Sequence, residues 1–265
     1  MPLLETHKQF EEVLKLLFCY WCGNPILPGE VRDRDHIPPR SCFAKVDRSI
    51  PLALPTHKIC NAAHNLDDEK IGQIIGLKYG QVPPSKRNRR LKFSRIYAPN
   101  GNQAVAITNV DIRGAIRRWI RGFHAALYRE PIPQNTVFAI ETPFPSASPK
   151  QHGPVFNPLR TPQHRMFVEV IKTNRAVRNF DRIQSNNKKL TYECVWDQAD
   201  GGQWICIFAL DLYGWKDLGD IKNFQARGCV GMYMTPSAIA PSLATKAKRL
   251  SLILPNYDKL DPFER

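Results

Sequence analysis

Two pairs of candidate metal ligands constrain this chain more than any other feature of its sequence. Cys19 and Cys22 form the first pair, and His57 and Cys60 form the second. Two residues separate the members of each pair, and this spacing lets both side chains of one tight turn reach a single ion. Gly23 directly follows the first pair and supplies the backbone freedom that such a turn needs. The sequence therefore predicts a structural Zn²⁺ ion that joins two separate segments.

An alternative interpretation of these residues stays open at this point. Free cysteine is often a small buried hydrophobic residue, so two unrelated pairs of buried thiols could have the same spacing. Two independent pairs at ligand spacing are harder to obtain by chance than one, and this favours the zinc site. The four remaining cysteines are expected to be reduced and mostly buried: Cys42, Cys194, Cys206 and Cys229.

A strand-like segment between the two pairs ends in an aspartate beside a histidine. Residues 31–36 alternate in character, Asp35 and His36 close the segment, and two prolines follow after one residue. An aspartate in this position can hold a hard divalent cation while a neutral imidazole takes a proton from water. Hydrolysis of a phosphodiester bond requires both. Such Asp-His pairs also occur in surface turns without any catalytic role. Only the four candidate zinc ligands on either side of Asp35 and His36 favour a catalytic role for this pair.

Because the four candidate zinc ligands lie on either side of Asp35 and His36, the segment 19–75 resembles the zinc-stapled branch of the HNH endonucleases, which have the ββα-metal fold. The resemblance implies that His36 is the general base, and that Asp35 and Asn61 bind a catalytic Mg²⁺ or Mn²⁺ ion. His64, one helical turn after Asn61, would assist this metal or contact phosphate. It implies a metal-dependent endonuclease that cleaves DNA and leaves 5′ phosphates, with activity that falls below about pH 6.

The segment departs from the pattern of this family in two places. The central Asn that orients the catalytic histidine is absent from residues 51–55. Either a backbone carbonyl of this stretch orients His36 instead, or the activity is reduced or lost. His57 stands where a cysteine is more common, and zinc accepts either residue. The missing Asn supports a rival function, a non-catalytic zinc-containing module that binds nucleic acid. A third interpretation is an antiviral or toxin effector that cuts DNA after a protein partner activates it.

Positive charge is concentrated directly after this segment. Residues 1–79 carry ten Lys or Arg and ten Asp or Glu, whereas residues 80–130 carry eleven and two. A polyanion laid across such a belt releases counterions and gains salt-sensitive affinity. The candidate DNA contacts are Lys86, Arg87, Arg89, Arg90, Arg113, Arg117 and Arg121. RNA is an alternative partner. The alternative to nucleic-acid contact is that these residues form a solvated linker and a solvated helix face.

The hydrophobic pattern predicts an α+β protein, with a zinc-stapled ββα-metal domain at 1–80, a basic linker at 81–90 and an α+β domain at 91–265. The last domain would engage nucleic acid or form oligomers. The helices are expected at 6–17, 58–78, 111–128 and 163–178. The strands are expected at 30–36, 49–54, 91–98, 104–109, 189–197, 203–212 and 250–254.

The location and the assembly of the chain are expected from simpler features. No apolar run is long enough to cross a membrane, and the N-terminus lacks the basic and then apolar order of a signal peptide. These features predict a cytoplasmic protein. A single ββα-metal site cuts one strand, so double-strand breaks would require a homodimer or two sequential nicks.

Overall fold

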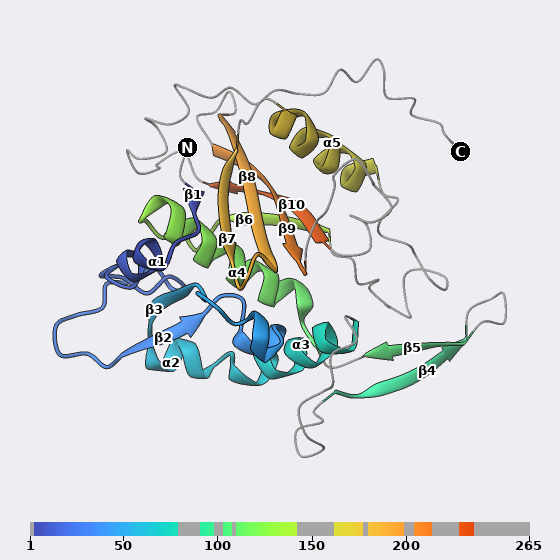
Figure 1. Ribbon diagram of the computed structural model, residues 1–265, viewed down its shortest axis with the longest axis horizontal. Coiled ribbons are helices and arrows are strands. Elements are labelled where there is room, and N and C mark those ends of the chain that lie inside the picture. The colour runs from blue at the N-terminus through green and yellow to red at the C-terminus, as the bar shows by residue number, and fades with distance from the viewer. Residues whose placement is uncertain are drawn as a thin grey trace.

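The computed structural model describes residues 3–78, 91–97, 103–107, 110–141, 162–176, 180–198, 204–213 and 228–235 (Figure 1). Within these residues the protein is α+β, as predicted, and it contains a mixed β-sheet. None of the described helices is long and apolar enough to span a membrane.

The N-terminal part contains the predicted order of two strands and a helix. Its elements are β1 (Leu3–Leu4), α1 (His7–Val13), β2 (Arg32–His36), the 3-10 helices η1 (Arg40–Cys42) and η2 (Lys45–Asp47), β3 (Ala53–His57), α2 (Lys58–Ala62) and α3 (Asn65–Lys78). Strands β2 and β3 are antiparallel, with Arg32 opposite His57 and His36 opposite Ala53.

Several elements in this part differ from the prediction in their bounds. Helix α1 ends at Val13 because the chain turns there towards the first ligand pair, and Leu17 is left 75 % exposed. Strand β3 begins later than expected and runs through Pro55, which is tolerated because β3 pairs with β2 alone. The single helix expected at 58–78 is divided into α2 and α3 at residues 63–64.

The second part is built on a six-stranded sheet with the order β1-β7-β8-β9-β10-β6. Its strands are β6 (Val137–Glu141), β7 (Asp181–Ser185), β8 (Leu190–Gln198), β9 (Trp204–Leu212) and β10 (Gly228–Thr235). Strand β1 joins β7 in parallel, and the other pairs are antiparallel. The sequence predicted the β8–β9 hairpin but not β1, β6, β7 or β10. A separate hairpin, β4 (Phe93–Tyr97) and β5 (Gln103–Ile107), was predicted.

Helices cover both faces of this sheet. Figure 1 shows α4 (Ile112–Tyr128) on one face and α5 (Pro162–Ala176) on the other, close to two of the predicted helices. Alternate residues of β9 point to opposite faces of the sheet. Cys206 and Phe208 pack with α4, whereas Ile207 packs with α5.

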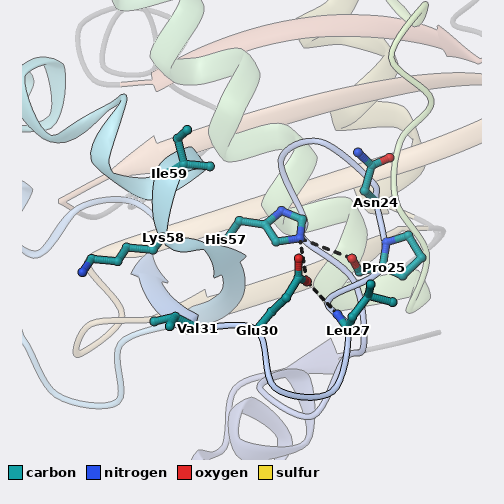
Figure 2. Close-up of a pocket in the computed structure, with 8 residues that line it drawn as sticks. All are labelled: Asn24, Pro25, Leu27, Glu30, Val31, His57, Lys58 and Ile59. Carbon is teal, nitrogen blue, oxygen red and sulfur yellow. Dashed lines mark hydrogen bonds and ion pairs between the residues drawn. The ribbon is translucent and has the colours of Figure 1, made fainter.

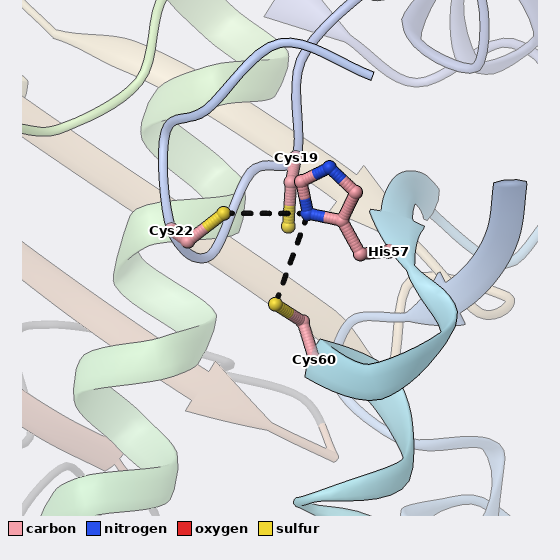
Figure 3. Close-up of side chains that lie close together, drawn as sticks. All are labelled: Cys19, Cys22, His57 and Cys60. Atoms are coloured by element: carbon pink, nitrogen blue, oxygen red, sulfur yellow. Dashed lines mark hydrogen bonds between the residues drawn. The ribbon is translucent and has the colours of Figure 1, made fainter. Parts of the chain in front are cut away.

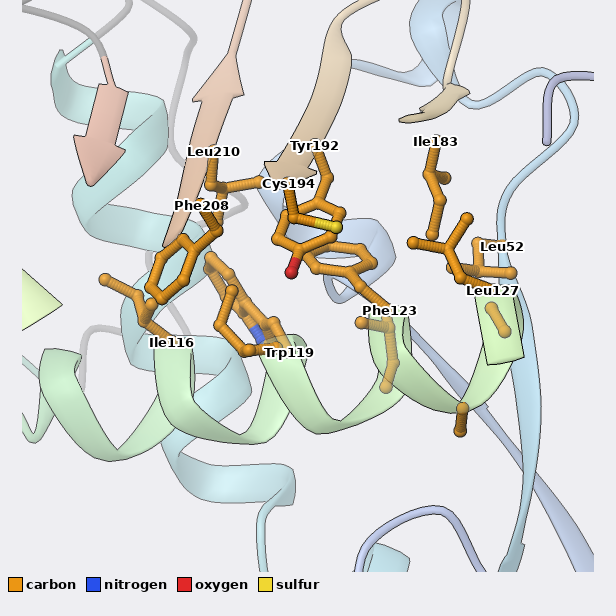
Figure 4. Packing of buried hydrophobic residues seen from close by; sticks show 14 of the residues in the cluster. Leu52, Ile116, Trp119, Phe123, Leu127, Ile183, Tyr192, Cys194, Phe208 and Leu210 are labelled. Carbon is orange, nitrogen blue, oxygen red and sulfur yellow. The ribbon is translucent and has the colours of Figure 1, made fainter. Parts of the chain in front are cut away.

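Helix α4 is the centre of the fold. Asp111 caps its N-terminus by accepting a hydrogen bond of 2.8 Å from the amide of Gly114. One side packs against the sheet, where the ring of Phe123 stacks on Tyr192 at 4.6 Å between centroids (Figure 4). Its other side contacts α1, α3 and Ile37, so the buried residues on both sides of the predicted linker belong to one hydrophobic cluster.

Several predicted features lie outside the described residues. These are the basic linker 81–90 with its four candidate DNA contacts and the strand at 250–254. The prediction for the four remaining cysteines is confirmed, since Cys42, Cys194, Cys206 and Cys229 are buried and free.

Candidate functional site

The four predicted zinc ligands lie together. The Sγ atoms of Cys19, Cys22 and Cys60 and one ring nitrogen of His57 all lie within 4.8 Å of one another (Figure 3). The Nδ1 atom of His57 is 3.4 Å from Cys22 Sγ and 3.9 Å from Cys60 Sγ. Ligands of a tetrahedral zinc ion are about 3.5–3.8 Å apart, so the set fits the ion. Within the described residues this is the one group of Cys, His, Asp or Glu side chains found that could hold a metal such as zinc.

Local structure places each ligand. The amide of Cys19 donates to the carbonyl of Asn24, and the amide of Gly23 donates to the carbonyl of Cys19, which closes the turn that holds Cys22. Gly23 has a φ of +79°, the left-handed conformation that glycine adopts without strain. The second pair comes from one junction, since His57 ends β3 and Cys60 lies in α2.

The thiols respond to one another electrostatically. Burial opposes ionisation of Cys19, but backbone amides of the turn and the Thr56 hydroxyl outweigh it and lower the pKa of Cys19 to about 7. Burial and the neighbouring Cys19 and Cys22 raise the pKa of Cys60 to about 12. One thiolate therefore forms readily and opposes the next, and a divalent cation would remove that repulsion.

The outer side of the His57 ring faces acceptors. Its Nε2 atom is 3.3 Å from the carbonyl oxygen of Pro25 and 3.6 Å from the carboxylate of Glu30 (Figure 2). These acceptors favour a proton on Nε2, which leaves Nδ1 free to bind a metal. A groove of about 520 Å³ beside the ring is lined by residues of the loop 24–31 and by residues 57–59.

No protein-family model, curated protein or solved structure matches this chain. The possible roles of its residues therefore follow from their own geometry and chemistry.

Asp35 faces the interior and is 5 % exposed. Its carboxylate accepts a hydrogen bond from the hydroxyl of Tyr20 and lies 3.5 Å from Nη1 of Arg118, on α4. Burial and Asp35 raise the pKa of Tyr20, so this hydroxyl stays protonated and donates. Burial raises the pKa of Asp35 as well, and the charge of Arg118 opposes that rise.

Asn61 and His64 make contacts of a different kind. The amide nitrogen of Asn61 donates to Oδ2 of Asp33 at 2.9 Å, and not to Asp35. The ring of His64 meets Trp21 edge-on at 4.8 Å between centroids, and its buried Nε2 atom has no hydrogen-bond partner among the described residues. Because Asp35 is paired with Arg118 and Asn61 with Asp33, the two residues do not fit a shared Mg²⁺ or Mn²⁺ ion in this arrangement.

His36 is half-buried at the end of β2. Burial, followed by the positive charges of Arg40 and Arg34, lowers its pKa below the ordinary imidazole value. Both arginines are exposed. No described backbone carbonyl orients the ring, in contrast to the expectation. The site is thus a neutral imidazole beside two cations that can attract a phosphate.

The three arginines of α4 that were predicted to contact DNA differ in burial. Arg113 and Arg117 are exposed and remain candidates for phosphate contact. Arg121 was predicted to contact DNA, but it is 3 % exposed and donates to the carbonyl oxygens of Ile132 and Pro133. Its interior position leaves no access to a polyanion, so the prediction is wrong for this residue.

Sequence reasoning missed Arg118 as a partner of Asp35. A signal was present, since helical spacing places Arg118 on one face with the small residues Ala115 and Gly122. Small neighbours allow close packing around a long side chain, and Arg118 is 1 % exposed. No pattern in the sequence indicates which carboxylates contact Arg118.

Proposed function

We propose that this chain hydrolyses phosphodiester bonds in DNA and that His36 is the general base. The observation that carries the proposal is the position of His36 at the end of β2, half-buried and beside the exposed Arg34 and Arg40. The sequence resemblance to the HNH endonucleases supports the same assignment, and so does a Cys/His group that could hold a metal such as zinc.

The residues of the chain have separate roles in this proposal. Arg34 and Arg40 attract the phosphate by charge-assisted hydrogen bonds, and the neutral ring of His36 accepts a proton from the attacking water. Burial, and after it the charges of Arg40 and Arg34, lower the pKa of His36 and keep the imidazole neutral near pH 7. A zinc ion would fix β3 and α2 against the turn that carries Cys19 and Cys22. Asp35 and Asn61 do not fit the catalytic Mg²⁺ or Mn²⁺ ion that the resemblance implies, so the proposed roles of these residues include no such ion.

A specific observation favours a second candidate, a non-catalytic module that binds nucleic acid. The carboxylate next to the proposed base is buried against Arg118, a protein cation. In that case the phosphate backbone of the nucleic acid is bound by Arg34, Arg40, Arg113 and Arg117, and no phosphodiester bond is cleaved.

Cleavage and binding assays separate the two candidates. Supercoiled plasmid and a matched RNA are incubated with wild type, His36→Ala and a control, His7→Ala, which changes an exposed histidine of α1. Each protein is assayed with Mg²⁺, with Mn²⁺ and with EDTA, and duplex binding is measured by fluorescence anisotropy. Loss of a general base lowers the rate by about 10²–10⁴-fold.

The outcomes are distinct. Hydrolysis by wild type and by His7→Ala, lost in His36→Ala with binding retained, supports the nuclease. Salt-sensitive binding by all three proteins without cleavage of either substrate supports the module and overturns the catalytic role of His36. Cleavage of RNA alone would keep the mechanism and change the substrate.

A further inference from the structure

A buried ionic cluster connects α4 to the strand that carries His36. Asp35 of β2 and Asp68 of α3 both contact the guanidinium of Arg118, and the hydroxyl of Tyr20 donates to Asp35. Arg118 is 1 % exposed and Asp35 is 5 % exposed. These groups come from four separate segments, so the cluster exists only in the folded chain.

The negative charges of Asp35 and Asp68 in this cluster require a cation to balance them. Two carboxylates that face each other in a poorly hydrated space repel, and an uncompensated buried charge is costly. Burial raises the pKa of Asp68 to about 6, and the charge of Arg118 opposes that rise. Arg118 spans both acids, since Nη1 lies 3.5 Å from Asp35 and Nη2 contacts Asp68.

We propose that Arg118 is the resident cation of this cluster, and that its guanidinium occupies the space between Asp35 and Asp68 that a divalent ion would otherwise take. The fold thus supplies from α4 the positive charge that the sequence resemblance assigns to a metal at Asp35. Arg118 is a positioning residue, because it holds the strand end beside His36 without reaching the substrate. The inference is independent of whether His36 cleaves DNA.

Removal of Arg118 should expose ligands that a metal can use. The two carboxylates offer oxygen atoms, and the buried Nε2 of His64 has no hydrogen-bond partner among the described residues. His64 is close enough for the charge of Arg118 to lower its pKa, after the larger effect of burial. Oxygen and imidazole ligands suit Mn²⁺, which reports its own binding by electron paramagnetic resonance.

The test measures Mn²⁺ binding to the zinc-loaded full chain. Wild type, Arg118→Met and Arg117→Met are compared, and Arg117→Met is the matched control because Arg117 is the exposed neighbour on α4. We expect wild type and Arg117→Met to bind no Mn²⁺ at this cluster. Arg118→Met should bind one ion, with an affinity at least about tenfold above the upper limit measured for wild type, since a buried unit charge no longer opposes it. Its Tm should rise with added Mn²⁺.

Two results would overturn the inference. One is tight binding of a Mn²⁺ ion by wild type that Asp35→Asn abolishes. The other is a folded Arg118→Met protein that binds no Mn²⁺. If Arg118→Met does not fold, Mn²⁺ binding is compared between wild type and Asp35→Asn. The inference requires that neither of these two proteins binds Mn²⁺ at this cluster.

Discussion

The Nε2 atom of His57 lies 3.6 Å from the Oε2 atom of Glu30, on the side of the ring opposite the cysteine sulfur atoms. An outer carboxylate of this kind orients a histidine ligand and raises its basicity. Glu30→Gln should therefore weaken zinc affinity by about 10–100-fold. The change keeps an oxygen that can accept the 2.7 Å hydrogen bond from the amide of Leu27, so the loop should remain closed.

Competition for zinc with a chromophoric chelator measures this effect. Glu11→Gln is the control, because Glu11 is an exposed acid of α1 that pairs with His7. Equal zinc affinity in Glu30→Gln and wild type would show that the carbonyl of Pro25 alone orients His57.

Removal of the metal should loosen the N-terminal part. Cys60→Ser replaces one ligand, and we expect the zinc content to fall from about one ion per chain to near zero. The Tm should fall as well, because binding free energy of a structural ion is folding free energy. Metal analysis and circular dichroism give the readout. Cys42→Ala is the control, because Cys42 is a buried thiol that is not one of the four candidate zinc ligands, and this variant should retain its zinc. Full zinc content in Cys60→Ser would remove this residue from the ligand set.

The pH dependence of cleavage follows from the lowered pKa of His36. A general base acts when it is neutral, so the single-turnover rate should rise with pH through a midpoint below about 6.5 and be lost at lower pH. Replacement of both Arg34 and Arg40 by Gln removes positive charges that lower this pKa. The midpoint of the double variant should move upward. Equal wild-type rates at about pH 5 and about pH 8 would exclude His36 as the base.

The contact between α4 and the end of β2 depends on Gly122. A Cβ atom at this position would lie 2.4 Å from Cδ1 of Ile37, the residue after His36. Gly122→Val should overpack this contact and lower the free energy of unfolding by about 1–3 kcal/mol. Arg117→Val, which places the same side chain on the exposed face of α4, should change it by less than about 1 kcal/mol. Urea unfolding monitored by circular dichroism gives both values, and similar losses in the two variants would show that helix propensity, not packing, is the cause.

Local patterns predicted the elements whose signals lie within a few residues. The pairs Cys19–Cys22 and His57–Cys60, the capped helix α4 and the β8–β9 hairpin each follow from short-range spacing. The prediction of β10 failed for a physical reason. It lies between β9 and β6, and Gly231 is needed because a Cβ there would lie 2.3 Å from the carbonyl oxygen of Ala139. Glycine weakens a strand pattern, and only the neighbouring strands make it necessary.

The candidate site shows the same division. The sequence by itself determined the four ligands that could hold zinc and the position of His36 at the end of a strand, because turn geometry and strand alternation act over short distances. Only the tertiary structure decided that Asp35 pairs with Arg118, that Asn61 pairs with Asp33, and that Arg121 is buried. These partners come from segments far apart in the chain. The charge balance of a buried carboxylate depends on which segments the whole core brings against it, and no local pattern contains that information.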